Sequence, residues 1–170
     1  MQKSYTMTML LVCFIMSGLI DKSWALSMSD DAIKQKIESE ANDSYNLRAK
    51  KVKIAVENGY VVLYGTVNKY IQKMLYEKIT WKTEGVVEVD NEIQVVPIIL
   101  QTVDAIERKV KEILQTYPQF QGVSVSVSVE AGAVDVLIRL NHPADVVFLK
   151  NRIAEIEGVI SIDIQAKFIA

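Results

Sequence analysis

The spacing of apolar residues in the first half of the chain predicts a helix followed by a β-hairpin. Ile33, Ile37 and Ala41 recur at helical spacing, and Ser27 and Ser29 before them are candidate N-caps. The next segment alternates apolar and other residues, which is typical of strands with one buried face. Its apolar face comprises Val52, Ile54, Val56, Val61, Leu63, Gly65 and Val67.

The dipeptide Asn58-Gly59 divides this alternating segment and predicts a two-residue hairpin turn, because both residues tolerate a positive φ. With the turn at this point, the apolar residues of the two strands share one face. The expected cross-strand pairs are Val56 with Val61, Ile54 with Leu63 and Val52 with Gly65.

A second helix and a third strand complete the unit. The helix is expected over residues 68–83 with Asn68 as its N-cap, and the strand over residues 86–95. The order helix, strand, strand, helix, strand favours a three-stranded sheet with two helices on one face. The helix side expected to meet the sheet comprises Ile71, Leu75, Tyr76 and Ile79.

The pattern repeats without a gap at an offset of 73 residues, so that Gly59 matches Gly132 and Gly85 matches Gly158. The second half predicts a turn at Ala131-Gly132 and a helix over residues 141–157, with Pro143 in its first turn. Its expected hairpin pairs are Val129 with Val134, Val127 with Val136 and Val125 with Ile138. We therefore expect an α+β protein of two tandem αββαβ modules, over residues 26–97 and 98–170.

The first 25 residues have the features of a secretory signal peptide. Lys3 gives a positive start, Met7–Ile20 is mostly apolar, and Ser23-Trp24-Ala25 is a small-x-small cleavage site. An exported chain that begins at Leu26 is expected. Two alternatives stay open, namely an uncleaved membrane anchor and a lipoprotein modified at Cys13.

Composition and charge exclude several function classes. The chain has 170 residues and a formal net charge of −2, which gives no support to nucleic-acid binding. With one cysteine and one histidine, neither a Cys/His metal site nor a disulfide framework is expected. His142 precedes Pro143 at a helix start, where an exposed residue is expected. We expect no nucleophile–base pair, no cofactor motif and no small-molecule substrate, and therefore no enzyme.

Together these features resemble the BON domain family. The first module has the helix, the Asn-Gly hairpin with a second glycine, and a helix that closes in Gly-Val-x-x-Val-x-Asn. The matching residues are Asn58, Gly59, Val61, Leu63, Gly65, Val67, Gly85, Val86, Val89, Asn91 and Val95. The second module departs from the family at Ile138 and Ile164, so its assignment depends on the internal repeat.

An exported chain with tandem BON domains is the arrangement of osmotically inducible periplasmic members of this family and of its dual-domain envelope members. The resemblance implies a periplasmic, non-enzymatic protein that associates weakly with phospholipid membranes in envelope maintenance or stress. The alternative is a periplasmic chaperone or assembly subunit that binds envelope proteins.

Acidic residues line one side of the third strand of the first module, at Glu88, Asp90 and Glu92. A strand separates them by about 6–7 Å, which is too wide for a compact calcium site, so cross-strand charge pairing is favoured. Lys51 and Lys53 lie on the outer side of the first strand, so the third strand is expected beside the first. The basic cluster Arg48, Lys50, Lys51 and Lys53 is interpreted as a solvated strand entrance.

One helix face is a candidate binding surface. At about 100° per residue, Tyr70, Met74 and Trp81 fall opposite the expected core side of the helix, with Lys73 and Lys78 beside them. Tryptophan and tyrosine suit the membrane–water boundary, and each lysine near an anionic surface contributes about 1 kcal/mol. This set predicts a weak contact with anionic phospholipid. Packing of the same residues against the second module is the alternative.

The outer face of the first sheet is a second candidate surface. Tyr60, Val62 and Tyr64 alternate outward on the hairpin, which is unusually apolar for a solvated face. This face is expected to be either the interface between the two modules or a dock for a protein client.

Overall fold

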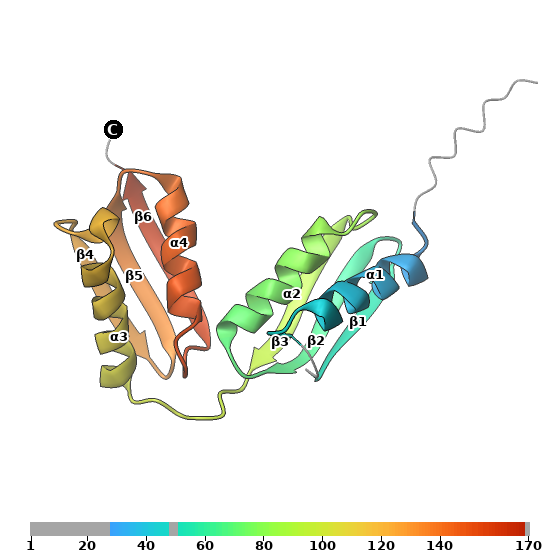
Figure 1. Cartoon of the computed structure of the whole chain (residues 1–170), viewed down its shortest axis with the longest axis horizontal. Coiled ribbons are helices and arrows are strands. Elements are labelled where there is room, and N and C mark those ends of the chain that lie inside the picture. The colour runs from blue at the N-terminus through green and yellow to red at the C-terminus, as the bar shows by residue number, and fades with distance from the viewer. Residues whose placement is uncertain (1–27, 48–50, 169–170) are drawn as a thin grey trace, which may run out of the picture.

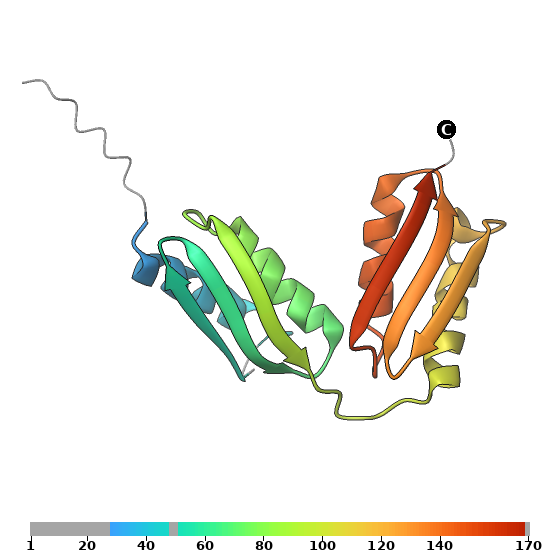
Figure 2. The same cartoon turned by 180° about the vertical axis from the view of Figure 1, so that it is seen from behind.

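In the computed structural model, which describes residues 28–47 and 51–168, the chain forms two modules of the same architecture (Figure 1). The elements of the first are α1 (Asp30–Asp43), β1 (Lys51–Glu57), β2 (Tyr60–Val67), α2 (Tyr70–Lys82) and β3 (Glu88–Val95). Those of the second are α3 (Val103–Thr116), a short 3-10 helix η1 (Pro118–Phe120), β4 (Val125–Glu130), β5 (Ala133–Leu140), α4 (Pro143–Ala154) and β6 (Ser161–Phe168). Both helices of each module cover the same face of its three-stranded sheet (Figure 2), so the predicted α+β fold class is confirmed.

Several predictions concern residues outside those that the structure describes. They are the signal peptide with its cleavage after Ala25, the N-cap at Ser27, and the contributions of Cys13, Arg48 and Lys50.

Two-residue turns set the register of both hairpins. Asn58 and Gly59 have φ angles of 52° and 80°, and Ala131 and Gly132 have φ angles of 47° and 89°. In the first hairpin Ile54 lies opposite Leu63, with the flanking pairs as predicted. The second hairpin also has the three predicted pairs. The register predictions are therefore confirmed for both modules.

The carboxylate of Asp30, in the first turn of α1, binds the turn of the first hairpin. Its Oδ2 accepts a hydrogen bond from the Asn58 N–H at 2.8 Å, and its Oδ1 accepts one from the Gly59 N–H at 3.0 Å. The side chain of Ser29 caps the same helix by accepting from the Ala32 N–H, so the cap predicted at Ser29 is confirmed. These contacts fix the start of α1 over the hairpin turn.

The central strand of the first sheet is β2, which pairs antiparallel with β1 and parallel with β3. The prediction that the third strand lies beside the first is therefore wrong. The segment β2–α2–β3 is a strand–helix–strand crossover, which places its two parallel strands next to each other with the helix on the covered face. Tyr64 consequently lies between Lys53 and Glu92. Since β1 and β3 are not neighbours, the predicted cross-strand charge pairing between them does not form within one sheet.

Each module has its own core between sheet and helices. The buried residues of the first core are Ile33, Ile37, Ala41, Leu47, Ile54, Val61, Leu63, Val67, Tyr76 and Ile93. On α2, Tyr76 is buried as predicted, whereas Leu75 and Ile79 are half-buried against this core and Ile71 is half-buried without belonging to it. The other buried residues of α2 and its C-cap are polar, namely Gln72, Thr80 and Thr83. The Thr80 and Thr83 hydroxyls donate to carbonyls one helical turn earlier, and the Gln72 amide donates to the Asn46 carbonyl.

Gln72 organises the start of α2 in place of the predicted N-cap Asn68. The helix begins at Tyr70, and the Gln72 Oε1 accepts from the N–H groups of Asn68 and Lys69 at 3.0 and 3.1 Å. Its Nε2 donates to the Asn46 carbonyl at 2.8 Å, which links α2 to the segment after α1. The amide is buried with both its oxygen and its nitrogen hydrogen-bonded, so a polar residue occupies a buried position of the helix at which hydrophobic periodicity predicts an apolar one.

Gly65 provides a test of the tight pairing between β1 and β2. Its φ is +126°, and a Cβ at this position would lie 2.0 Å from the Lys51 carbonyl oxygen. We expect Gly65→Ala to lower the free energy of unfolding by at least about 2 kcal/mol, because strain and a backbone clash add. Gly122→Ala is the matched control, since its φ is +74° and nothing lies within 4 Å. Chemical denaturation should show the larger loss for Gly65→Ala, and equal losses would contradict the clash.

Candidate binding surfaces

The residues predicted to form one stripe on α2 lie in three different environments. Tyr70, Met74 and Trp81 all lie outside the core of the first module. Trp81, in the last turns, has 52% of its surface exposed, and Met74 is half-buried. Tyr70, in the first turn, packs against the core of the second module. Only the Trp81 end of the stripe is therefore open to solvent.

The contact between the modules joins the start of α2 to the end of α4 (Figure 1). The Lys69 Nζ lies 3.3 Å from the Glu157 Oε2, next to the packed ring of Tyr70. Burial raises the pKa of the Tyr70 hydroxyl, and the negative charge of Glu77 raises it further. A neutral, half-buried tyrosine is therefore a structural part of this contact.

Of the predicted lysines, Lys78 is exposed near Trp81, whereas Lys73 is half-buried. The backbone carbonyl of Lys73 accepts a hydrogen bond from the Asn91 Nδ2 at 3.2 Å, which ties α2 to β3. Lys82, in the last turn of α2, is also exposed. The open part of the surface thus combines Trp81 with Lys78 and Lys82, and the sequence analysis did not include Lys82.

Tyr60, Val62 and Tyr64 run along the middle of the outer face of the first sheet. The exposed fractions of Tyr60 and Tyr64 are 51% and 40%. This face lies on the side of the sheet away from the helices, and no described helix or strand covers it (Figure 2). It does not form the contact between the modules, which involves the start of α2 instead. The predicted role of this face as the interface between the modules is therefore wrong, and its role as a dock for a protein client stays a prediction.

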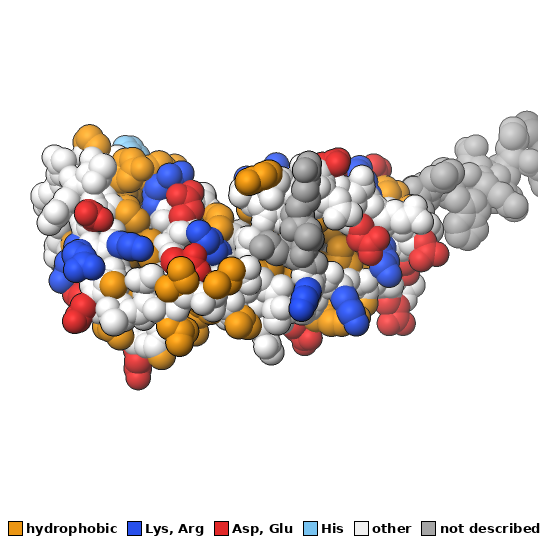
Figure 3. Space-filling model, turned by 60° about the horizontal axis from the view of Figure 1, so that its bottom comes forward, with side chains coloured by type: hydrophobic (Ala, Val, Ile, Leu, Met, Phe, Trp, Pro, Cys, Tyr) orange, Lys and Arg blue, Asp and Glu red, His pale blue; other side chains and the backbone are white. Residues whose placement is uncertain are grey.

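The connection between the modules carries an exposed apolar run that the sequence analysis did not single out. Ile98 and Leu100 are 76% and 87% exposed, and Val96 and Ile99 are exposed as well. Figure 3 shows hydrophobic side chains gathered on this side of the molecule. The run belongs to no helix or strand, so a search for periodicity misses it. The three consecutive aliphatic residues 98–100 between the two predicted modules could have indicated this exposed apolar segment.

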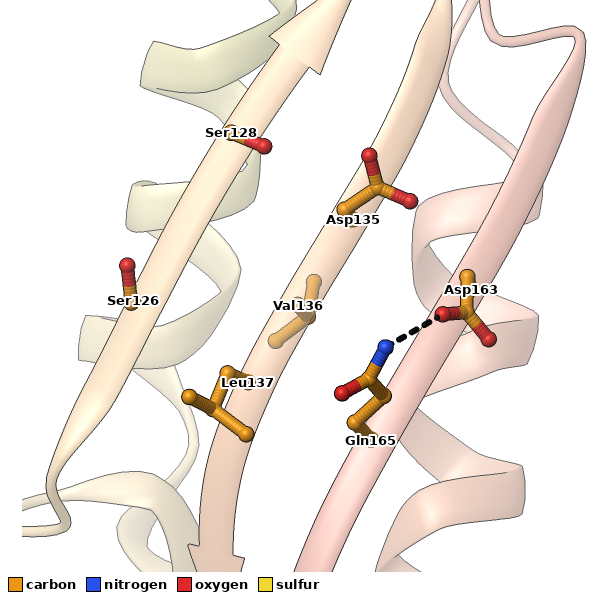
Figure 4. A pocket seen from close by; sticks show the side chains of 7 residues that line it. All are labelled: Ser126, Ser128, Asp135, Val136, Leu137, Asp163 and Gln165. Carbon is orange, nitrogen blue, oxygen red and sulfur yellow. Dashed lines mark hydrogen bonds between the residues drawn. The ribbon is translucent and has the colours of Figure 1, made fainter.

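The outer face of the second sheet is largely polar, whereas the first sheet has an apolar column along the middle of its outer face. Ser126, Ser128, Asp135 and Gln165 surround a shallow depression of about 110 Å³ (Figure 4). The Gln165 Nε2 donates to the Asp163 Oδ2 at 3.1 Å. The apolar column of the first module is therefore a property of its own side chains, not of the shared fold.

The described residues form neither a metal-binding cluster nor a helix that could span a membrane. Within residues 28–47 and 51–168, no three Asp, Glu, His or Cys side chains gather closely enough to hold a metal ion. In the same part of the chain, no helix has the length and apolar character needed to cross a bilayer. His142 is exposed at the N-cap of α4 and its side chain makes no capping hydrogen bond.

The raised pKa of Tyr70 predicts a loss of stability at alkaline pH. The neutral phenol is favoured in the folded state, so its contribution is complete below the ordinary tyrosine pKa of about 10 and is lost as pH rises through the raised value. Between pH 9 and pH 11, the unaltered chain should lose more free energy of unfolding than the Tyr70→Phe variant. Guanidinium denaturation at both pH values checks this, and an identical loss in the two proteins would contradict it.

Comparison with known proteins assigns the first module. Residues 29–97 match the family model of the BON domain, and the match does not extend into the second module. No curated protein sequence matches the chain.

Two solved structures of CdsD, a structural protein of the type III secretion system of Chlamydia trachomatis, are similar in part. The first has 14% identity and a TM-score of 0.35, over 84% of this chain and 64% of that one. The second, a C-terminal domain, has 17% identity and a TM-score of 0.32, over 83% of this chain and 66% of that one. This chain thus spans less than two thirds of either CdsD chain. The match to the family model shows that residues 29–97 are a BON domain.

Proposed function

We propose that the chain is a non-enzymatic periplasmic protein that associates weakly with anionic phospholipid membranes in envelope maintenance or stress. The BON domain supports a phospholipid-binding or envelope-related role. The single observation that carries the proposal is the exposed Trp81 with Lys78 and Lys82 beside it on the open face of α2.

The chemistry of this face suits the boundary between membrane and water. The indole of Trp81 has an apolar body and one N–H donor, so it can lie at the level of the lipid headgroups. Two lysines near an anionic surface contribute about 2 kcal/mol together, and salt screens this attraction over about 8–10 Å. Binding is therefore expected to be weak, reversible and salt-sensitive.

The proposal includes the organisation of the whole chain. Residues 1–25 serve as a cleaved signal peptide, and residues 98–170 form a second, divergent BON domain. The second assignment is supported by the shared element order and by the positive φ angles at both hairpin turns. The second module also covers Tyr70, so the proposed membrane contact involves the exposed Trp81 end of α2.

A second candidate function is that of a periplasmic chaperone or assembly subunit. It is favoured by the exposed tyrosines Tyr60 and Tyr64, which offer an apolar face on the side of the sheet opposite α2. A client would bind there without involving Trp81, so variants at the two faces separate the two functions.

Vesicle flotation tests the membrane contact. The chain from Leu26 should float with anionic vesicles at low salt, and less at moderate salt or with neutral vesicles. Trp81→Ala should weaken binding about tenfold, equivalent to about 1.4 kcal/mol. Lys78→Glu with Lys82→Glu should abolish flotation, because attraction becomes repulsion.

Matched variants separate this surface from general effects of charge and apolar area. Lys36→Glu with Lys111→Glu changes the net charge equally at exposed sites on α1 and α3 and should still float. Ile98→Ser with Leu100→Ser tests the exposed connection and should reduce flotation less than Trp81→Ala does. The proposal fails if the unaltered chain does not float, or if the two charge variants lose binding equally.

Export gives an independent test. Expressed with its own leader in a Gram-negative bacterium, the protein should be released with the periplasmic fraction, and its N-terminal residue should be Leu26. Mass spectrometry of the purified chain checks the cleavage. An intact Met1 in the membrane fraction would indicate an anchor instead, and a lipid-modified Cys13 would indicate a lipoprotein.

A further inference from the structure

The outer face of the first sheet carries three columns of side chains with different chemistry. The outer residues of β1 include Lys51 and Lys53, those of β2 are apolar except for Thr66, and those of β3 are acidic except for Gln94. The register places Lys53, Tyr64 and Glu92 in one row. Basic and acidic columns are two strand spacings apart, or about 9–10 Å, with tyrosines between them. Among the described residues, none of these charged side chains forms an ion pair.

We propose that this face binds the same face of a second copy of the chain, so that the two sheets stack in a two-fold dimer. Stacked sheets lie about 10 Å apart with their strands within about 30° of each other. A two-fold axis parallel to β2 lays β1 of one copy over β3 of the other and keeps each row at its own level. Lys53 of each copy then faces Glu92 of the other, and the columns of tyrosines meet in the centre.

The charges select this axis over the alternative. A two-fold axis perpendicular to the strands would lay β3 over β3 and β1 over β1. Carboxylates of the column Glu88, Asp90 and Glu92 would then face carboxylates of the same column in the other copy, which is repulsive. Only the axis parallel to β2 brings unlike columns together, so the arrangement follows from the strand order β1-β2-β3.

The same geometry predicts that the dimer is weak. A face of three strands about eight residues long covers roughly 400 Å² in each copy, about half of a standard interface. At the hairpin end, Glu57 would face Glu88 of the other copy, which opposes association. The tyrosines supply most of the favourable contact, since aromatic residues are prominent in interface centres.

The second module lacks the features that this association requires. Leu137 occupies the position that matches Tyr64, but its row neighbours are Ser126 and Gln165, which carry no charge. The next outward row toward the turn places Asp135 beside Asp163. The dimer therefore forms through the first module, and its face lies across the sheet from α2 and Trp81. A variant or condition that abolishes membrane binding through Trp81 can therefore be distinguished from one that abolishes dimerisation.

Sedimentation equilibrium of the chain from Leu26, from about 1 μM to 1 mM at low salt, tests the dimer. The unaltered chain should be monomeric at the low end of this range and partly dimeric at the high end. Tyr64→Ala should weaken association at least tenfold, whereas Leu137→Ala at the matching position of the second module should leave it unchanged. Circular dichroism verifies that each variant is folded.

Charge exchange tests the proposed axis. Lys53→Glu and Glu92→Lys should each weaken association, and the double variant should restore it, because the two residues face each other between copies. Glu57→Gln should strengthen association, an effect that misfolding does not produce. A chain that stays monomeric at 1 mM overturns the proposal and leaves the face for a protein client. A dimer that the double exchange does not restore overturns it as well.

Discussion

The pairing register of the β1–β2 hairpin is the constraint on which the rest of the first module depends. Because side chains alternate between faces, a slip of one residue would move Leu63 out of the core and Tyr64 into it. The two-residue turn at Asn58-Gly59 excludes that slip, and the Asp30 carboxylate binds both N–H groups of the turn from the start of α1. One side chain thus joins the helix layer to the point at which the register is set.

Two helices per module can cover only one face of a three-stranded sheet, so the chemistry of the other face varies without cost to the core. The first module has tyrosines in its central column, whereas the second has Asp135 and Leu137 in that column. The cores have diverged too. Asn91 of β3 donates to the Lys73 carbonyl of α2, but Ile164 takes the matching place in β6. Two modules of one architecture therefore present different surfaces.

Features fixed by local contacts could be predicted from the sequence. Both hairpin registers follow from the alternation of apolar residues and from turns with positive φ, which are properties of adjacent residues. The resemblance to the BON domain was based on the same local pattern, and the family model matches residues 29–97. The strand order was not predicted correctly. The lysines of β1 and the carboxylates of β3 suggested that these strands are neighbours, whereas the β2–α2–β3 crossover places β3 beside β2.

The candidate surfaces depended on contacts that no local pattern contains. Helical spacing predicted that Tyr70 and Trp81 lie outside the first core. Only the position of the second module shows that Tyr70 packs against the second core while Trp81 is exposed to solvent. Gln72 is buried because its amide has partners on two segments, which hydrophobic periodicity does not detect. The exposed residues Ile98 and Leu100 were not predicted as a surface, because the segment between the modules has no helical or strand periodicity of apolar residues.

The central claim is that the first module supplies the membrane contact while the second covers the start of α2. Amide chemical shifts of the isotope-labelled chain, recorded with anionic lipid nanodiscs, test this claim most directly. The account predicts shift changes concentrated in residues 74–82, around Trp81, with residues 125–168 unaffected. Changes concentrated in the second module, or equal changes with neutral nanodiscs, would contradict it.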